Sequence, residues 1–168
     1  EGTSEFNWTT FEKIVFASDR YAFFSPDLFS MNPDGTGIQQ VTHLPAGGWP
    51  HMYGAVLNRA GNKIALTLET PGGGYGANTD LWMLDVVPDE NGNPTQLGDP
   101  LPLRYDPACQ ENAVAWSPDD SQLLMNRSWP DGQRQIVVID MATDEETILA
   151  ESRKSLGASD WNPVEPSP

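Results

Sequence analysis

The sequence is poor in the residues that disulfides, zinc sites and cationic surfaces require. Its one cysteine, Cys109, allows neither a disulfide within the chain nor a cysteine-based zinc site. Lysine and arginine together number 9 against 24 aspartates and glutamates, a formal net charge of -15. Nucleic acids and anionic membrane surfaces bind cationic faces, so this balance argues against both as the main partner.

Long apolar runs and helical periodicity are missing as well. A membrane-spanning helix needs about 18 consecutive apolar residues, and the sequence has no such run. No window sustains the apolar period of an amphipathic helix, so we expect almost no helix. Glycine and proline number 15 each and recur at regular intervals. That spacing is typical of many short strands joined by turns.

The clearest unit of strands and turns occupies residues 13–43. A β-rich run at 13–20 is followed by a second run at 27–32. Residues 32–37 read NPDGTG, a turn in which proline presets φ and glycine permits positive φ. Residues 38–42 alternate as a half-exposed outer strand would. We interpret this unit as an antiparallel meander.

Two further copies of the unit follow in the same order of strands and turns. Equivalent strands begin at Lys13, Lys63 and Gln122. A repeat of about 50 residues that forms a four-stranded meander is typical of a β-propeller blade. The later strands are expected at 53–57, 63–68, 80–85 and 95–97 in the second copy and at 112–116, 122–126, 135–140 and 146–150 in the third.

The motifs of these copies resemble the TolB-type β-propeller repeat. The resemblance rests on Trp116-Ser-Pro-Asp119, on Ala17-Ser-Asp-Arg20 and on residues 27–42, and it covers about residues 11–163. The second copy departs from the pattern, because Leu57-Asn-Arg-Ala60 replaces the Trp-Ser-Pro-Asp turn. The resemblance implies a six-bladed ring and a periplasmic or extracellular location.

We therefore predict an all-β chain made of three propeller blades and an extra inner strand near its C-terminal end. The blades are expected at about residues 6–44, 52–98 and 109–152. Residues 153–163 would supply the inner strand of a further or partner blade, and residues 164–168 form a Pro-rich tail. Three blades alone leave two open apolar faces, and no cap for either is evident in the sequence.

A strand exchange between copies would cover these faces. Residues 158–163 match the inner strand at 113–118, and residues 6–10 are a poorer candidate for the first blade's inner strand. We expect the C-terminal strand to complete the first blade of a neighbour, which closes a six-bladed dimer. The alternatives are a head-to-tail filament and a fragment of a longer chain. The residues expected to take part are Ser159, Asp160, Trp161, Asn162, Pro163, Phe6 and Trp8.

One rim of the predicted blades is aromatic and rich in arginine, and the other is acidic. Aromatic residues and arginine are enriched at binding hot spots, so we predict that the first rim binds another protein or a glycan. An alternative for its paired phenylalanines is that they cover a blade edge or the subunit boundary. We interpret the acidic rim as a solvated face. The predicted binding residues are Tyr21, Phe23, Phe24, His43, Trp49, His51, Tyr53, Tyr75, Arg104, Tyr105, Trp129 and Arg134.

Little in the sequence predicts catalysis. Residues 89–93 match the first ligand spacings of a calcium loop, but Pro94 and Pro100 stand where that loop needs glycine and glutamate. His43 and His51 lie in one loop without an evident third metal ligand. No Gly-x-Ser-x-Gly motif occurs. We predict a non-enzymatic binding and assembly module with no cofactor and no metal. The alternative is a glycan- or peptide-binding accessory domain of a larger extracytoplasmic protein.

Overall fold

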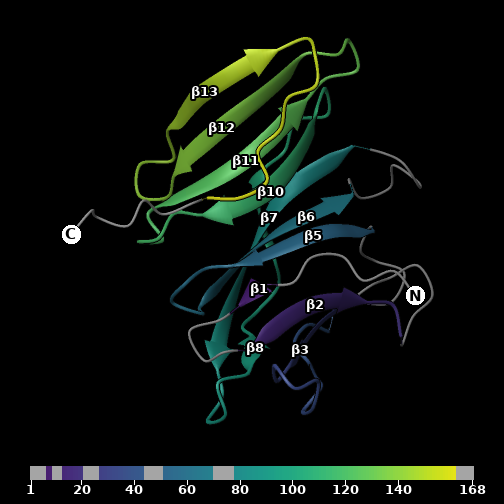
Figure 1. Cartoon of the computed structure of the whole chain (residues 1–168), viewed down its shortest axis with the longest axis vertical. Helices are drawn as coiled ribbons and strands as arrows, with labels where there is room; N and C mark the ends of the chain where they lie inside the picture. The colour runs from purple at the N-terminus through teal and green to yellow at the C-terminus, as the bar shows by residue number, and fades with distance from the viewer. Residues whose placement is uncertain (1–6, 9–12, 21–26, 44–50, 70–77, 162–168) are drawn as a thin grey trace.

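The computed structural model of the chain describes residues 7–8, 13–20, 27–43, 51–69 and 78–161. Within these ranges the chain is all-β, with its strands in antiparallel sheets that stack as successive blades (Figure 1). None of the described residues belongs to a helix that could cross a membrane. We call the side of a blade that meets the preceding blade its back face and the opposite side its front face.

The first blade is the sheet β1–β2–β3–β4. Strands β2 and β3 pair along their whole length, as the sequence predicts. The outer strand is shorter than predicted, because the N–H groups of Val41 and Thr42 both donate to the Leu28 carbonyl and so interrupt the ladder. The strands are β1 Asn7–Trp8, β2 Ile14–Ser18, β3 Asp27–Met31 and β4 Gln39–Gln40.

The second blade has one strand more than predicted. The outer edge of its long strand β7 pairs with β8 near one end and with β9 near the other. The chain leaves the edge between them at Gly98, which has φ of 78°. The sequence does not predict β9, because a proline within a short run argues against a strand. The strands are β5 Met52–Leu57, β6 Lys63–Glu69, β7 Thr79–Pro88, β8 Pro94–Gln96 and β9 Leu101–Arg104.

The third blade is the sheet β10–β11–β12–β13, and its strands contain all four of the predicted ones. Two turns of this blade hold a non-glycine residue at positive φ, Asp120 at 59° and Asp144 at 62°. Aspartate tolerates this conformation better than most residues. The strands are β10 Gln110–Trp116, β11 Gln122–Ser128, β12 Arg134–Asp140 and β13 Glu146–Ser152.

Two apolar clusters join the blades, one at each boundary. Side chains on the back face of each later blade meet side chains on the front face of the blade before it. Leu66 and Met125 hold equivalent positions on the back faces of the second and third blades, and both are completely buried. Leu66 packs in the cluster that contains Val15 and Ala17 of the first blade. The core of the protein is therefore the set of boundaries between blades.

Candidate functional site

The front face of the third blade is covered by the chain's own continuation. Leu123 packs in the cluster shared with the second blade, so alternation turns Leu124 and Asn126 to the front face. Residues 153–161, which follow β13, run across this sheet over β11 (Figure 1). Asn126 holds them there: its Oδ1 accepts the Ala158 N–H at 2.8 Å and its Nδ2 donates to the Ala158 carbonyl at 2.9 Å.

The same contact joins the second and third blades. The N–H of Ala113, in the inner strand β10, donates to Thr67 Oγ1 at 3.0 Å. Thr67 and Asn126 occupy equivalent positions in β6 and β11, and Ala113 and Ala158 are equivalent in the match between residues 113–118 and 158–163. Ala158 therefore lies where the inner strand of a fourth blade would lie, and it contacts the third blade as β10 contacts the second.

Residues 158–161 occupy this position without forming a strand. In the described part of the chain, Ser159 and Asp160 have no ladder partner, and the Asp160 carboxylate accepts the N–H of Trp161 at 2.7 Å. Trp161 itself is half-buried. The predicted exchange residues Asn162 and Pro163 lie outside the described residues. Residues 158–161 therefore contact the third blade through Ala158 but pair with no strand in the described part of the chain.

The inner position of the first blade is filled by β1. Its backbone pairs with β2 in a register that places Trp8 opposite Ile14. The corresponding pair in the third blade is Trp116 opposite Leu123. Of the two candidates that the sequence offered for this position, the N-terminal one occupies it within the chain. Phe6 lies outside the described residues.

Asp120 fastens the turn of the third blade to the turn of the second. Its Oδ1 accepts the N–H of Arg59 at 2.8 Å, and its Oδ2 accepts the N–H of Ala60 at 2.8 Å and the side-chain amide of Asn58 at 3.1 Å. Gly61 holds the equivalent position in the second blade and has no side chain for such a contact. Asp120 belongs to the acidic rim that the sequence predicts as a solvated face, and the sequence pattern gives no sign of this contact.

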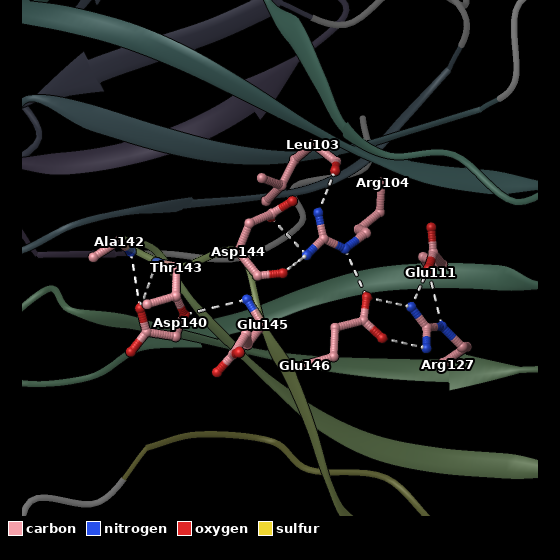
Figure 2. Close-up of polar contacts among 10 residues, drawn as sticks. All are labelled: Leu103, Arg104, Glu111, Arg127, Asp140, Ala142, Thr143, Asp144, Glu145 and Glu146. Atoms are coloured by element: carbon pink, nitrogen blue, oxygen red, sulfur yellow. Dashed lines mark hydrogen bonds and ion pairs between the residues drawn. The ribbon is translucent and has the colours of Figure 1, made fainter.

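A chain of ion pairs crosses the same boundary (Figure 2). Arg127 lies between Glu111 and Glu146, with N–O distances of 2.8 Å to each. Arg104, on β9 of the second blade, contacts Glu146 at 2.6 Å and Asp144 at 2.8 Å. Arg104 was predicted to bind a partner on the rim. In the structure its guanidinium forms ion pairs with Asp144 and Glu146 and so connects the second blade to the third.

Burial and ion pairing shift the pKa values of two carboxylates in this network, Glu111 and Glu146, in opposite directions. Burial raises the pKa of Glu111, whose side chain is 1% exposed, although the Arg127 guanidinium opposes the shift. The hydrogen bond from Arg127 lowers the pKa of Glu146, and that from Arg104 adds to the effect. Arg127 therefore has a structural task at the blade boundary, because it neutralises a buried carboxylate.

The structure places the other predicted rim residues in several local settings. His51 and Tyr53 make an edge-to-face ring contact with centroids 5.2 Å apart. The N–H of His43 donates to Gln96 Oε1 of the second blade. Tyr105 and Arg134 are exposed, and Trp129 is half-buried. The remaining predicted residues lie outside the described part of the chain: Tyr21, Phe23, Phe24, Trp49 and Tyr75.

The described residues contain no group of three or more His, Cys, Asp or Glu side chains arranged to hold a metal ion. The Asp89 carboxylate, the first residue of the calcium-like sequence, accepts the N–H groups of Asn91 and Asn93 and so closes a turn. Burial raises the pKa of Cys109 to about 12. Its thiol is therefore protonated at neutral pH and is a poor nucleophile.

Comparison with known proteins identifies the fold. No protein-family model and no curated protein matches the sequence. A TolB structure from Agrobacterium tumefaciens matches with a TM-score of 0.61 and 14% identity over 90% of this chain and 50% of that one. An oligogalacturonate lyase gives 0.56 and 15% over 89% and 41%, and prolyl oligopeptidase B from Galerina marginata gives 0.55 and 14% over 90% and 23%.

These matches show that the chain has a TolB-like β-propeller fold, as its repeat motifs predicted. The chain spans half the length, or less, of the solved structures that it matches. At identities this low the likeness describes the fold alone.

Proposed function

We propose that this chain is a non-enzymatic assembly and binding module in which residues 158–161 provide the inner strand of a blade in a second copy. Two copies associated in this way, each with three blades, would close one six-bladed ring. A partner protein or a glycan would bind the aromatic rim, and the location would be extracytoplasmic. The location rests on the resemblance to TolB-type repeats.

The contact between Ala158 and Asn126 is the observation that carries the proposal. It repeats the contact between Ala113 and Thr67, which joins an inner strand to the preceding blade. Strand exchange requires that the donated segment stay on its own third blade while its edge pairs with another sheet. Asn126 supports the first requirement, because it binds both the N–H and the carbonyl of one residue.

The size of the matched structures favours a second candidate. The TolB structure from Agrobacterium is matched over 50% of its length. The remaining strands of a fourth blade could therefore belong to a longer form of the same chain, in which this module would be half of one ring. In both candidates Ala158 binds to Asn126. They differ in whether the sheet that the segment joins belongs to a second copy or to a longer form of the same chain.

Light scattering on the 168-residue chain tests the proposal. We expect about twice the chain mass, and a monomer for a truncation that ends at Gly157. Asn126→Ala removes two hydrogen bonds of about 1 kcal/mol each, so dimerisation should weaken by at least about tenfold. Asn91→Ala, at an exposed turn position, is the matched control and should keep the parent mass.

Three outcomes decide between the candidates. A dimer that is lost on truncation and weakened by Asn126→Ala supports exchange between copies. Large polydisperse species lost in the same way would indicate a filament instead of a closed ring. A soluble monomer for both the chain and the truncation would overturn the proposal and favour the half-ring of a longer chain.

A further inference from the structure

We infer that residues 158–161 of a second copy add to the inner edge of β2, in the register that β1 holds, so that β1 is the segment displaced by the exchange. The inference rests on the proposed function and adds to it the acceptor strand, the register and the competing segment. Each element comes from the pairing observed within the chain.

The register follows from the third blade. There the inner strand pairs Trp116 with Leu123. Leu123 and Ile14 are equivalent, as the second residues of repeats that begin at Gln122 and Lys13. Trp161 is the equivalent of Trp116, so the same geometry places Trp161 opposite Ile14.

The two competing segments are alike in sequence. Asn7-Trp8 and Asp160-Trp161 each present a short polar residue followed by tryptophan. The backbone of β1 places Asn7 opposite Val15 and Trp8 opposite Ile14. In the third blade, after the bulge that follows Ala113, Ala115 pairs with Leu124 and Trp116 with Leu123. The equivalent pairing would place Asp160 opposite Val15 and Trp161 opposite Ile14, the same two positions.

The incoming segment would pair with β2 at a position next to those that β1 occupies. Among the described residues, Asn7 and Trp8 of β1 pair with β2. In the third blade Ala113 pairs with Met125, and the equivalent pair in the exchanged blade is Ala158 with Phe16. The exchanged segment would therefore pair with β2 at three positions while Ala158 keeps its hydrogen bonds to Asn126 of its own copy, so the segment would bridge the two copies.

The back face of the first blade carries an aromatic pair, Phe16 and Phe29, that is already buried within the single chain at 5% and 1% exposure. Phe16 and Phe29 stack there with centroids 5.9 Å apart, and the Arg20 guanidinium lies 4.6 Å from the Phe29 centroid. Phe16 is equivalent to Leu66 and Met125, each of which packs in a boundary cluster with the preceding blade. In the closed ring the preceding blade would be the third blade of the other copy.

Removal of the competing strand is the first test. Asn7→Pro/Trp8→Pro disfavours β1, because proline lacks the N–H and is excluded from inner ladders. We expect the dimer dissociation constant from light scattering to fall at least about tenfold. Asp160→Pro/Trp161→Pro places the same substitutions in the other segment and should abolish the dimer.

Cross-linking tests the register directly and does not depend on the proline variants. One copy carries Ile14→Cys and the other Trp161→Cys, both with Cys109→Ala. Residues directly opposite in a ladder have Cβ atoms about 5 Å apart, so a disulfide between the copies is expected under mild oxidation. Asp160→Cys replaces Trp161→Cys in the control, and because adjacent residues point to opposite faces it should not cross-link.

The results separate the two proposals. A dimer that cross-links through Ile14 and Trp161 supports the inference. A dimer that fails to cross-link in this register, or whose affinity does not rise in a folded Asn7→Pro/Trp8→Pro variant, overturns the inference and leaves the proposed self-association intact. The absence of a dimer from every variant overturns the proposed function itself.

Discussion

The indole N–H of Trp116 donates a hydrogen bond of 3.0 Å to the backbone carbonyl of Val56, across the boundary between the second and third blades. Both residues belong to the apolar cluster at that boundary. The bond therefore satisfies a carbonyl on the inner strand of one blade with a side chain from the inner strand of the next, and it fixes the stacking of the two.

Trp116→Phe should lower the free energy of unfolding by about 1–3 kcal/mol, because it leaves the buried Val56 carbonyl without its donor. Denaturant unfolding measures the change. Trp129→Phe is the control, since Trp129 is half-buried and lies in a turn, and it should change stability much less. Equal losses in the two variants would contradict a specific role for the indole bond.

Asp120→Asn should destabilise the protein by about 1–2 kcal/mol, since a carboxylate that accepts three hydrogen bonds is replaced by an amide with one oxygen. Asparagine tolerates the positive φ of this position, so backbone strain is not added. Asp99→Asn removes the same charge from an exposed position and should be nearly neutral. If the two variants unfold alike in denaturant, the Asp120 contact contributes nothing.

Arg127→Met should cost about 3–5 kcal/mol at neutral pH, because it leaves the buried Glu111 carboxylate without its cation. Burial already raises the pKa of Glu111 above its ordinary value of 4.5, and loss of Arg127 should raise it further. Glu111 is then protonated in both the folded and unfolded states below pH 4.5, so the deficit of the variant should shrink as the pH falls. Arg134→Met, at an exposed position, controls for the loss of charge. A deficit that does not change with pH would contradict this account.

Asp119→Asn should reduce the loss of stability in acid. Hydrogen bonds from Ser117 and Ser121 lower the Asp119 pKa from 3.8 to about 2. A carboxyl with a lowered folded-state pKa stabilises the fold above its unfolded pKa, and that stabilisation is lost as the pH falls through the folded value. Unfolding free energies measured between about pH 4 and pH 2 should therefore fall less in the variant than in the parent. Asp99→Asn should follow the parent, and parallel curves for Asp119→Asn would reject the prediction.

Much of each blade could be read from the sequence, because strands and turns depend on local alternation and on residues with special backbone preferences. The strands β2, β3, β6 and β11 lie where the apolar runs predicted them. Strand β9 was not predicted, because its short run contains a proline, and it forms by pairing with part of the β7 edge.

The candidate site was predicted in part. The match between residues 158–163 and 113–118 identified the inner-strand segment, but its partner Asn126 could not be found from the pattern. Asparagine in a strand has many roles, and this one appears only when the third blade is folded and the chain returns across it. The sequence also left residues 6–10, the poorer match, and residues 158–163 as alternatives for the inner strand of the first blade, and the pairing of β1 with β2 shows that the first occupies it within the chain.

By itself the sequence determined the repeat and the order of all strands but β9, since these follow from side-chain alternation and turn chemistry between near neighbours, and its motifs resemble those of TolB-type propellers. Only the tertiary structure decided how the blades are joined. Asp120 accepts hydrogen bonds from the backbone N–H groups of Arg59 and Ala60 in the preceding blade, and Arg104 forms an ion pair with Asp144 in the following one. These partners lie far apart in the chain, and their contacts depend on how one sheet stacks on the next, which no local pattern encodes.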